Sequence, residues 1–159
     1  MYRWDALKAD KWFIDYQNCY TFMGVMSIRA LFSNCAEAFI KAGQKDRALA
    51  MLEKCEEIMW RFPVSAIPLG FSGNDYMVVK MIDQYYRLGK ADKARELVDR
   101  FIEDLFAATA FYLDFYDVAK SEFELCGNYI YFVTDTMKDN GDAEKGKTIL
   151  KRFNEIVKS

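Results

Sequence analysis

Four carboxylates lie close together in the most aromatic stretch of the chain, FAATAFYLDFYDVAKSEFELCGNYIYFV, and they are the residues best suited to acid–base chemistry. A pair of acids about 5–10 Å apart can hydrolyse a glycosidic bond. The first two acids are three positions apart and share a helix face if the helix is continuous. The same density of Phe and Tyr is typical of a helix that lines a packed core, which is the interpretation we favour, or of an exposed docking patch. The four acids are Asp114, Asp117, Glu122 and Glu124.

The chain contains no histidine among its 159 residues. This excludes a Ser-His-Asp triad, a Cys-His pair and a histidine-containing zinc site. The cysteines form no C-x-x-C pair, and we expect them to be small buried apolar residues, although a Cys35–Cys55 bridge stays open in an oxidising compartment. Phosphate-binding glycine loops are also missing from the sequence. We therefore expect a protein that is not an enzyme and that holds no cofactor or metal. The cysteines are Cys19, Cys35, Cys55 and Cys126.

The charge balance and the hydrophobic pattern argue against two classes of partner, nucleic acids and the interior of a membrane. The 22 basic and 24 acidic residues give a net charge of −2 and are interspersed, which argues against nucleic-acid binding. The longest uncharged stretches, 16–28 and 62–74, have thirteen residues each, fewer than the roughly 18–20 that a membrane-spanning helix needs. A length of 159 residues suits one domain with a real core.

A repeat organises the chain around three glycines, Gly43, Gly89 and Gly141. Each glycine is preceded at four positions by a large side chain and followed at three by an acid, at four by a base and at five by a small residue. Two apolar residues then follow at positions eight and nine. The large residues are Phe39, Tyr85 and Met137, the acids Asp46, Asp92 and Glu144, and the small residues Ala48, Ala94 and Gly146.

This pattern predicts helical hairpins with short turns. A glycine just after an apolar helical stretch takes the left-handed conformation that ends a helix. The acid then lies in the first turn of the next helix, where it faces the positive end of the dipole. The small residue lets the two helices approach closely, and stacking of the hairpins buries their apolar stripes.

The hairpins resemble tetratricopeptide repeats, most closely at Ala36, Phe39, Gly43 and Ala48. The resemblance implies an all-α fold in which about three antiparallel hairpins, after a leading helix at 4–15, stack as a right-handed superhelix. The glycines are 46 and 52 positions apart, against about 34 in that family, so the helices or loops must be longer. We expect one domain over 1–159, with hairpins at roughly 20–61, 74–108 and 111–158. In the third hairpin, we expect the first part, 111–140, to be one helix or two helices with a break near Gly127.

The resemblance also implies a binding groove along the first helix of each hairpin. The groove residues of each hairpin include an acid, which is Glu37, Asp83 or Asp135. These acids disfavour capture of a partner's C-terminal carboxylate and favour a basic or hydroxyl-rich ligand, such as a peptide or a glycan. The alternative is an ordinary solvated helix face with local ion pairs. The groove residues are Glu37, Lys41, Tyr76, Asp83, Tyr86, Arg87, Tyr131 and Asp135.

A more particular resemblance covers roughly residues 12–105. The turn AGQKDRA, the Pro-containing link and the segment YYRLGKADKA are similar to the C-terminal soluble tail of bacterial multi-pass membrane proteins whose N-terminal halves resemble protein O-mannosyltransferases. This implies a non-catalytic interaction or scaffolding module on the extracytoplasmic (periplasmic) side of the inner membrane, tethered to it but not spanning it. Any glycosyltransferase activity would belong to a membrane half that is not in this sequence. The partner would be a protein or peptide, basic or glycan-bearing.

Two other functions stay open. One is a carbohydrate-active enzyme domain that uses the helix carboxylate pair. The other is a free-standing cytoplasmic adaptor of the tetratricopeptide type.

Overall fold

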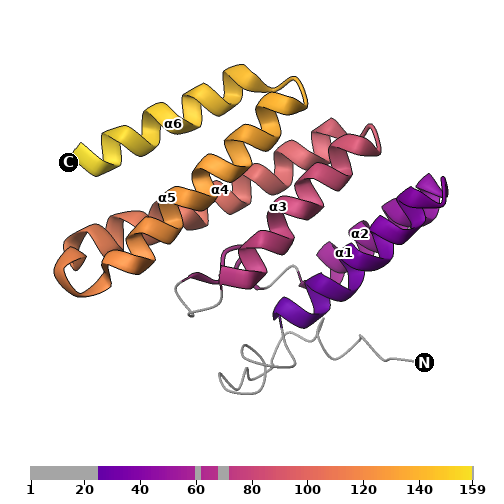
Figure 1. Ribbon diagram of the computed structural model, residues 1–159, viewed down its shortest axis with the longest axis horizontal. Coiled ribbons are helices and arrows are strands. Elements are labelled where there is room, and N and C mark those ends of the chain that lie inside the picture. Colours follow the sequence, from indigo (N-terminus) through magenta and orange to yellow (C-terminus); the bar gives the residue numbers. More distant parts are fainter. Residues whose placement is uncertain (1–24, 60–61, 68–71, 159) are drawn as a thin grey trace. The chain divides into compact units, whose positions relative to one another are not determined.

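Six helices make up the part of the chain that the structure describes. The structure is a computed structural model, and it describes residues 25–59, 62–67 and 72–158 (Figure 1). No strand occurs within these residues, so the expected all-α class is confirmed for them. The expected leading helix at 4–15 and Cys19 lie outside the described residues. The helices are α1 (Val25–Lys41), α2 (Lys45–Met59), α3 (Ser72–Arg87), α4 (Ala91–Asp114), α5 (Tyr116–Asp139) and α6 (Ala143–Lys158).

The three repeat glycines end α1, α3 and α5 in the same way. Gly43, Gly89 and Gly141 have φ values of 71°, 74° and 89°, and no other described residue has a positive φ. After each glycine, the next backbone N–H bonds to the carbonyl of the large residue four positions before the glycine; for example, the Lys90 N–H lies 2.9 Å from the Tyr85 oxygen. This is the Schellman arrangement, which satisfies carbonyls that a helix end leaves open. The predicted turns are therefore confirmed.

The small residue of the repeat lies where the helices of each hairpin meet. Ala48 and Ala94 are fully buried, and Gly146 is also buried. A Cβ added at Gly146 would lie 3.4 Å from the Thr134 carbonyl oxygen of α5, so this hairpin has little room for a larger side chain. The predicted acids Asp46, Asp92 and Glu144 do lie in the first turns of α2, α4 and α6.

The chain divides into two compact units, Met1–Pro63 and Val64–Ser159. In the first unit, α1 and α2 pack as an antiparallel hairpin around Phe32, Ala36, Leu52 and other apolar side chains. The buried Arg29 donates a hydrogen bond of 2.9 Å from its guanidinium to the Pro63 carbonyl. This bond ties the end of the unit back to the start of its first helix.

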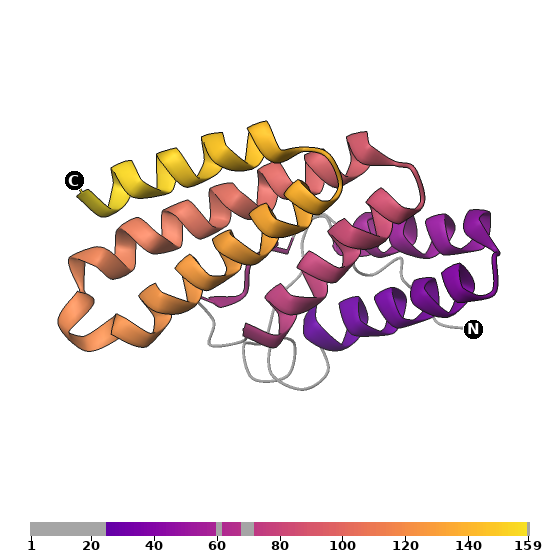
Figure 2. The same ribbon diagram turned by 45° about the horizontal axis from the view of Figure 1, so that its top comes forward.

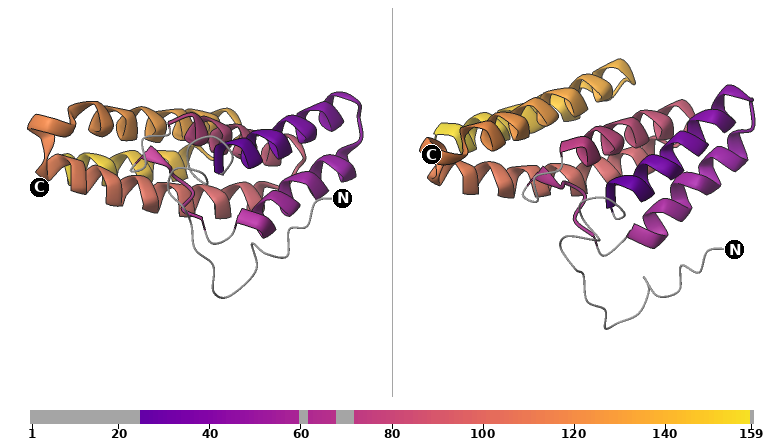
Figure 3. Two further views of the ribbon diagram at one scale, coloured as in Figure 1. Left: turned by 90° about the horizontal axis from the view of Figure 1, so that it is seen from below. Right: turned by 60° about the horizontal axis from the view of Figure 1, so that its bottom comes forward.

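The second unit is a two-layer bundle. Helix α3 packs against α4 and α5, and α4 packs against α5 and α6, so α3 and α5 form one layer and α4 and α6 the other (Figures 2 and 3). Tyr85 of α3, Phe101 and Leu105 of α4 and Ile130 and Met137 of α5 are among its largest fully buried side chains. The core between the layers therefore uses the apolar stripes that the repeat predicts.

Helices α4 and α5 have 24 residues each, whereas α3 and α6 have 16. The expected end of α4 at about Ala108 is wrong, because the following residues, including Ala110 and Leu113, form helix well and contain no glycine or proline. Helix α3 is the shorter partner of α4, so 107–124 extend past the first turn of α3, whereas α6 runs toward the same end of the unit (Figure 1). We call these residues the tip.

The break in the aromatic region lies at the tip and not at Gly127. Phe115 separates α4 from α5, and Ala119 has non-helical angles (φ −125°, ψ 30°) that kink the start of α5. Gly127 instead lies inside the regular helix, where an added Cβ would be 3.3 Å from the Phe153 ring of α6. Its small size serves close packing of α5 on α6, which the sequence pattern had not distinguished from a helix break.

Two carboxylates hold the segment 64–67 against the second unit. Asp104 accepts hydrogen bonds from the Val64 and Ser65 backbone N–H groups at 2.6 and 3.1 Å. The buried Asp75 accepts from the Ser65 hydroxyl at 2.6 Å and from the Ala66 N–H at 2.7 Å. The backbone of this segment is therefore hydrogen-bonded, and its residues are buried.

Asn74 belongs to the same cluster of hydrogen bonds. Helix α3 begins at Ser72, which places Asn74 in the third helical position. Its side-chain nitrogen donates to the Val64 carbonyl at 2.8 Å and to Asp75 at 2.9 Å. A buried amide that is used in this way connects the first turn of α3 to the segment before it.

Candidate interaction surface

The outer face of α3 and α5 is where the second unit presents the predicted groove residues. Because α4 and α6 cover the other side of this layer, the exposed residues of α3 and α5 point away from the core. Tyr76 is 58% exposed and Tyr131 is 49% exposed. Asp83 is half-buried and Asp135 is exposed, each six positions before its turn glycine. The two acids therefore lie in equivalent register on the two helices, whereas Tyr76 and Tyr131 are 13 and 10 positions before their glycines.

Local ion pairs occur on this face, as the alternative interpretation expected. Arg87 lies 3.4 Å from Asp83, and both side chains are close to 40% exposed. An exposed pair of this kind contributes little to stability and can exchange its partner easily. Asp83 is thus available to a competing cation at low cost.

Tyr86 has a structural partner that the sequence did not reveal. Its hydroxyl donates a hydrogen bond of 2.6 Å to Asp142, which also accepts two bonds from the Arg95 guanidinium at 2.7 and 2.8 Å. Burial and the hydrogen bond to Asp142 raise the pKa of Tyr86 well above its usual range. The Arg95 and Tyr86 hydrogen bonds lower the pKa of Asp142. Tyr86 therefore links the α3–α4 and α5–α6 turns, and its hydroxyl is occupied.

Tyr131 is placed partly by α6. Its ring meets the Phe153 ring edge to face, with centroids 6.1 Å apart, while half of the side chain stays exposed. The neighbouring Phe132 is also exposed, with its ring against Tyr129. The Tyr131 ring is held on one side by Phe153 and is exposed to solvent on the other. Such a ring suits a docking surface, because a side chain that is already ordered loses little entropy on binding.

The remaining two predicted groove residues lie in the first unit. Glu37 and Lys41 are one turn apart on α1, with their charged atoms 3.9 Å apart. Lys41 is largely exposed and Glu37 much less so. They form an ordinary helix-surface pair within that hairpin.

The four carboxylates proposed for acid–base chemistry lie on the tip. Asp114 ends α4 and Asp117 lies near the start of α5, so the continuous helix that would place them on one face does not exist. Both are exposed. The Ser121 hydroxyl donates to Glu122 at 2.7 Å and lowers the pKa of that carboxyl, which is the opposite of what a general acid needs.

The buried cysteines have thiols of low reactivity. Cys35, Cys55 and Cys126 are free thiols, and the last two are fully buried. Burial raises the pKa of Cys55 and of Cys126 to about 12, so neither forms a thiolate near neutral pH. This confirms the expectation of small buried residues for these two positions.

The described part of the chain shows neither a cluster of metal ligands nor a helix suited to the membrane. Residues 25–59, 62–67 and 72–158 contain no group of three or more Cys, Asp or Glu side chains that could hold a metal ion. None of the helices α1 to α6 is both long and apolar enough to cross a membrane.

Comparisons with known proteins give no relative. No family model matches the chain, and no match was found among curated proteins or among solved structures.

Proposed function

We propose that the chain is a non-catalytic interaction module of tetratricopeptide-like hairpins that binds a partner polypeptide along the outer face of α3 and α5. The observation that supports this most directly is the repetition within the second unit. The first helices of its two hairpins lie side by side, end in the same glycine turn and carry an acid six positions before it. Stacked hairpins of this kind use the face of their first helices as extended binding surfaces.

The charge of the face indicates the chemistry of the partner. Asp83 and Asp135 are carboxylates at matching positions, and Tyr76 and Tyr131 add exposed rings with a hydroxyl. Such a surface complements a segment that carries Lys or Arg, through ion pairs and through cation–π contacts. Tyrosine hydroxyls would also bond to sugar or serine hydroxyls, so a glycan-bearing segment fits the same surface.

A peptide titration tests this proposal. The probe is a labelled twelve-residue peptide with Lys at every third position among Ser and Gly, and fluorescence anisotropy reports binding. We expect the Lys peptide to bind and the matched Glu peptide to fail, with affinity falling as salt rises. A copy with O-mannosylated serines shows whether sugar adds affinity.

The matched variants decide whether the face is responsible. The pair Asp83→Asn with Asp135→Asn should weaken binding of the Lys peptide about tenfold. The control pair Asp92→Asn with Glu96→Gln removes two exposed acids from α4, on the other layer, and should leave binding unchanged. Equal binding of the Lys and Glu peptides, or equal loss in both variant pairs, would show that the proposal is wrong.

We further propose that this module is the soluble tail of a glycosyltransferase-like bacterial membrane protein, located on the periplasmic side, where it would recognise the acceptor polypeptide. The support is the resemblance over residues 12–105. Sequencing the native gene upstream of Met1 tests it. An upstream reading frame that encodes apolar helices is the expected result, whereas a gene that starts at Met1 would favour the free-standing cytoplasmic adaptor.

A further inference from the structure

The tip carries an exposed apolar patch with an acidic rim. Phe111, Phe115 and Val118 are each more than half exposed, and Val118 reaches 85%. The Phe111 and Phe115 rings contact each other, with centroids 5.0 Å apart. A shallow depression joins the patch to two carboxylates and, among its lining residues, includes no basic group. Its lining is Leu113, Asp114, Phe115, Tyr116, Asp117 and Val118.

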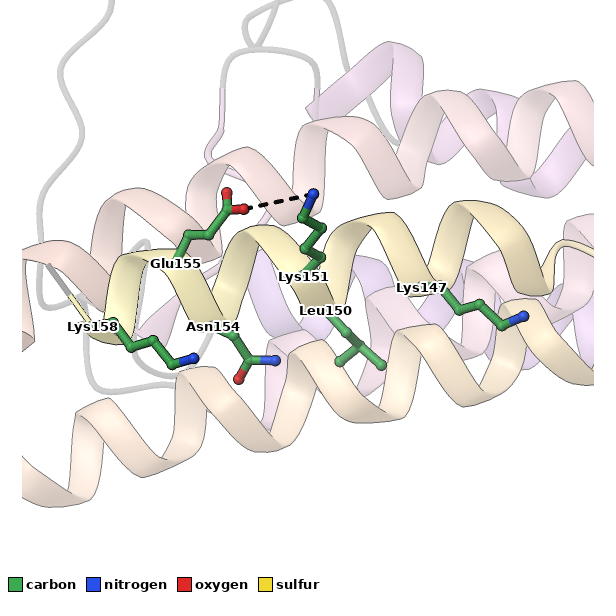
Figure 4. A pocket seen from close by; sticks show the side chains of 6 residues that line it. All are labelled: Lys147, Leu150, Lys151, Asn154, Glu155 and Lys158. Atoms are coloured by element: carbon green, nitrogen blue, oxygen red, sulfur yellow. Dashed lines mark ion pairs between the residues drawn. The ribbon is translucent and has the colours of Figure 1, made fainter.

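A second shallow depression runs along α6 and has the opposite charge. Figure 4 shows Lys147, Leu150, Asn154 and Lys158 projecting from one edge of α6 and the Lys151–Glu155 pair from the other edge. The charged atoms of that pair are 4.0 Å apart. Its lining therefore holds three lysines against one glutamate. Leu150 is half-buried and supplies an apolar centre.

The other basic residues of α6 are occupied inside the same molecule. Lys145 pairs with Asp99 at 2.6 Å and Arg152 with Glu103 at 2.5 Å, both on α4. Two of the lysines that line the α6 depression pair instead within α6, Lys147 with Glu144 and Lys151 with Glu155. This leaves the α6 depression with a surplus of positive charge toward solvent.

We propose that the tip of one copy docks on the α6 depression of a second copy of this chain. The two surfaces agree in their features: an apolar centre on each, two net negative charges on the tip lining and two net positive charges on the α6 lining. Both surfaces belong to the same four-helix unit. In a dimer with a two-fold axis the contact would form twice, which would double the buried area of two small depressions.

This contact is independent of the face of α3 and α5. It uses the α4–α5 turn and the outside of α6, so a peptide on the outer face of α3 and α5 would not be displaced by dimerisation. Failure of the peptide experiment would leave the dimer proposal standing, and the reverse also holds.

The test is the oligomeric state of the complete 159-residue chain by analytical ultracentrifugation. We expect a reversible monomer–dimer equilibrium with Kd of about 1–100 µM, weakened as salt rises. A chain that stays monomeric at all concentrations up to about ten times this range would overturn the proposal.

Charge reversal on each surface makes the test specific. Asp114→Lys with Asp117→Lys, and separately Lys147→Glu with Lys151→Glu, should each weaken dimerisation at least tenfold, because like charges then face each other. Mixing the two variants restores opposite charges in both contacts and should give a one-to-one heterodimer. A dimer that survives either reversal, or a mixture that stays monomeric, contradicts the proposed pairing.

Two controls separate docking from folding. Asp92→Lys with Glu96→Lys makes the same charge change elsewhere on α4 and should leave dimerisation as in the wild type. Val118→Arg, at the most exposed apolar position, should weaken the dimer without changing the circular dichroism spectrum or the melting temperature. An unchanged dimer with Val118→Arg would exclude the tip from the interface.

Discussion

The two ends of the α3–α6 unit close their helix pairs in opposite ways. At one end, two glycine turns lie beside each other and are connected by the Tyr86–Asp142–Arg95 hydrogen bonds and the Lys145–Asp99 ion pair. At the other end, the α4–α5 connection has no glycine and extends past its neighbours with exposed aromatic rings. The glycine end is held in a fixed geometry by these bonds, whereas the tip presents Phe111, Phe115 and Val118, each more than half exposed.

Removal of a buried ring should show the largest difference between the two ends. Tyr85→Ala deletes a fully buried side chain at the glycine end and should lower the free energy of unfolding by about 3–5 kcal/mol. Tyr112→Ala deletes a nearly buried ring in the tip, beyond the first turn of α3, and should cost less. Urea denaturation at 25 °C measures both. An equal loss would mean that the tip is as tightly packed as the glycine end.

The turn glycine gives the next largest effect. Gly89→Ala forces a side chain into a φ of 74° and should destabilise the fold by about 1–2 kcal/mol, even though no atom lies within 4 Å of the new Cβ. At the α4–α5 turn, Phe115 has a φ of −116°, which any residue adopts. The substitution Phe115→Ala therefore adds no backbone strain to the folded state. If Gly89→Ala were neutral, the left-handed turn would not be a constraint on the hairpin.

The Asp142 carboxylate should give a smaller effect that depends on pH. Arg95 and Tyr86 donate to it, Lys145 lies nearby, and its side chain is 13% exposed, so Asp142→Asn should cost about 1–2 kcal/mol at pH 7. Because the folded pKa of Asp142 lies below the unfolded value, its stabilisation is fully present above the unfolded pKa and is lost as the pH falls through the folded pKa. Asp117→Asn, at an exposed position of the tip, is the matched control.

The pH dependence of unfolding in wild type and in Asp142→Asn shows whether the charge of Asp142 provides the stabilisation. The difference in unfolding free energy between wild type and Asp142→Asn should shrink as the pH is lowered below about 4. A difference that is constant from pH 7 to pH 3 would show that the hydrogen-bond geometry, and not the charge, provides the stabilisation.

The smallest effect is expected at the most exposed apolar residue of the tip. Val118→Ser should change the free energy of unfolding by less than about 0.5 kcal/mol, because the side chain has almost no contact to lose. A loss above 1 kcal/mol would place Val118 in the folding core, and the contrast between the two ends would have to be redrawn.

The glycine end could be predicted from the sequence because each of its features is local. A glycine after an apolar helix, a large residue four positions before it and a small one five after it determine a turn and a close approach without knowledge of the rest of the chain. The residue after the glycine is Gln44, Lys90 or Asp142, with no common type. Nothing local therefore pointed to Asp142 as the partner of Tyr86.

The tip and the segment 64–67 could not be predicted in the same way. Neither Ala108 nor Asp114 is followed by a glycine or proline that would mark the end of α4, so the local sequence has no stop signal that chooses between them. Asp75 and Asp104 act through backbone groups that are nine and forty positions away, which only the folded chain brings to them. The predicted groove residues were placed, but whether they bind a partner stays a prediction.

The bonded segment at the start of the second unit has a consequence for protease sensitivity. Proline-rich links between helices are common cleavage sites, since a protease must draw about ten residues of backbone into an extended conformation. Here the Val64, Ser65 and Ala66 amides are held by carboxylates, and their side chains are buried. Cleavage within 64–67 therefore requires this cluster to open first, so the rate of nicking at these bonds would report how often the first turn of α3 comes loose.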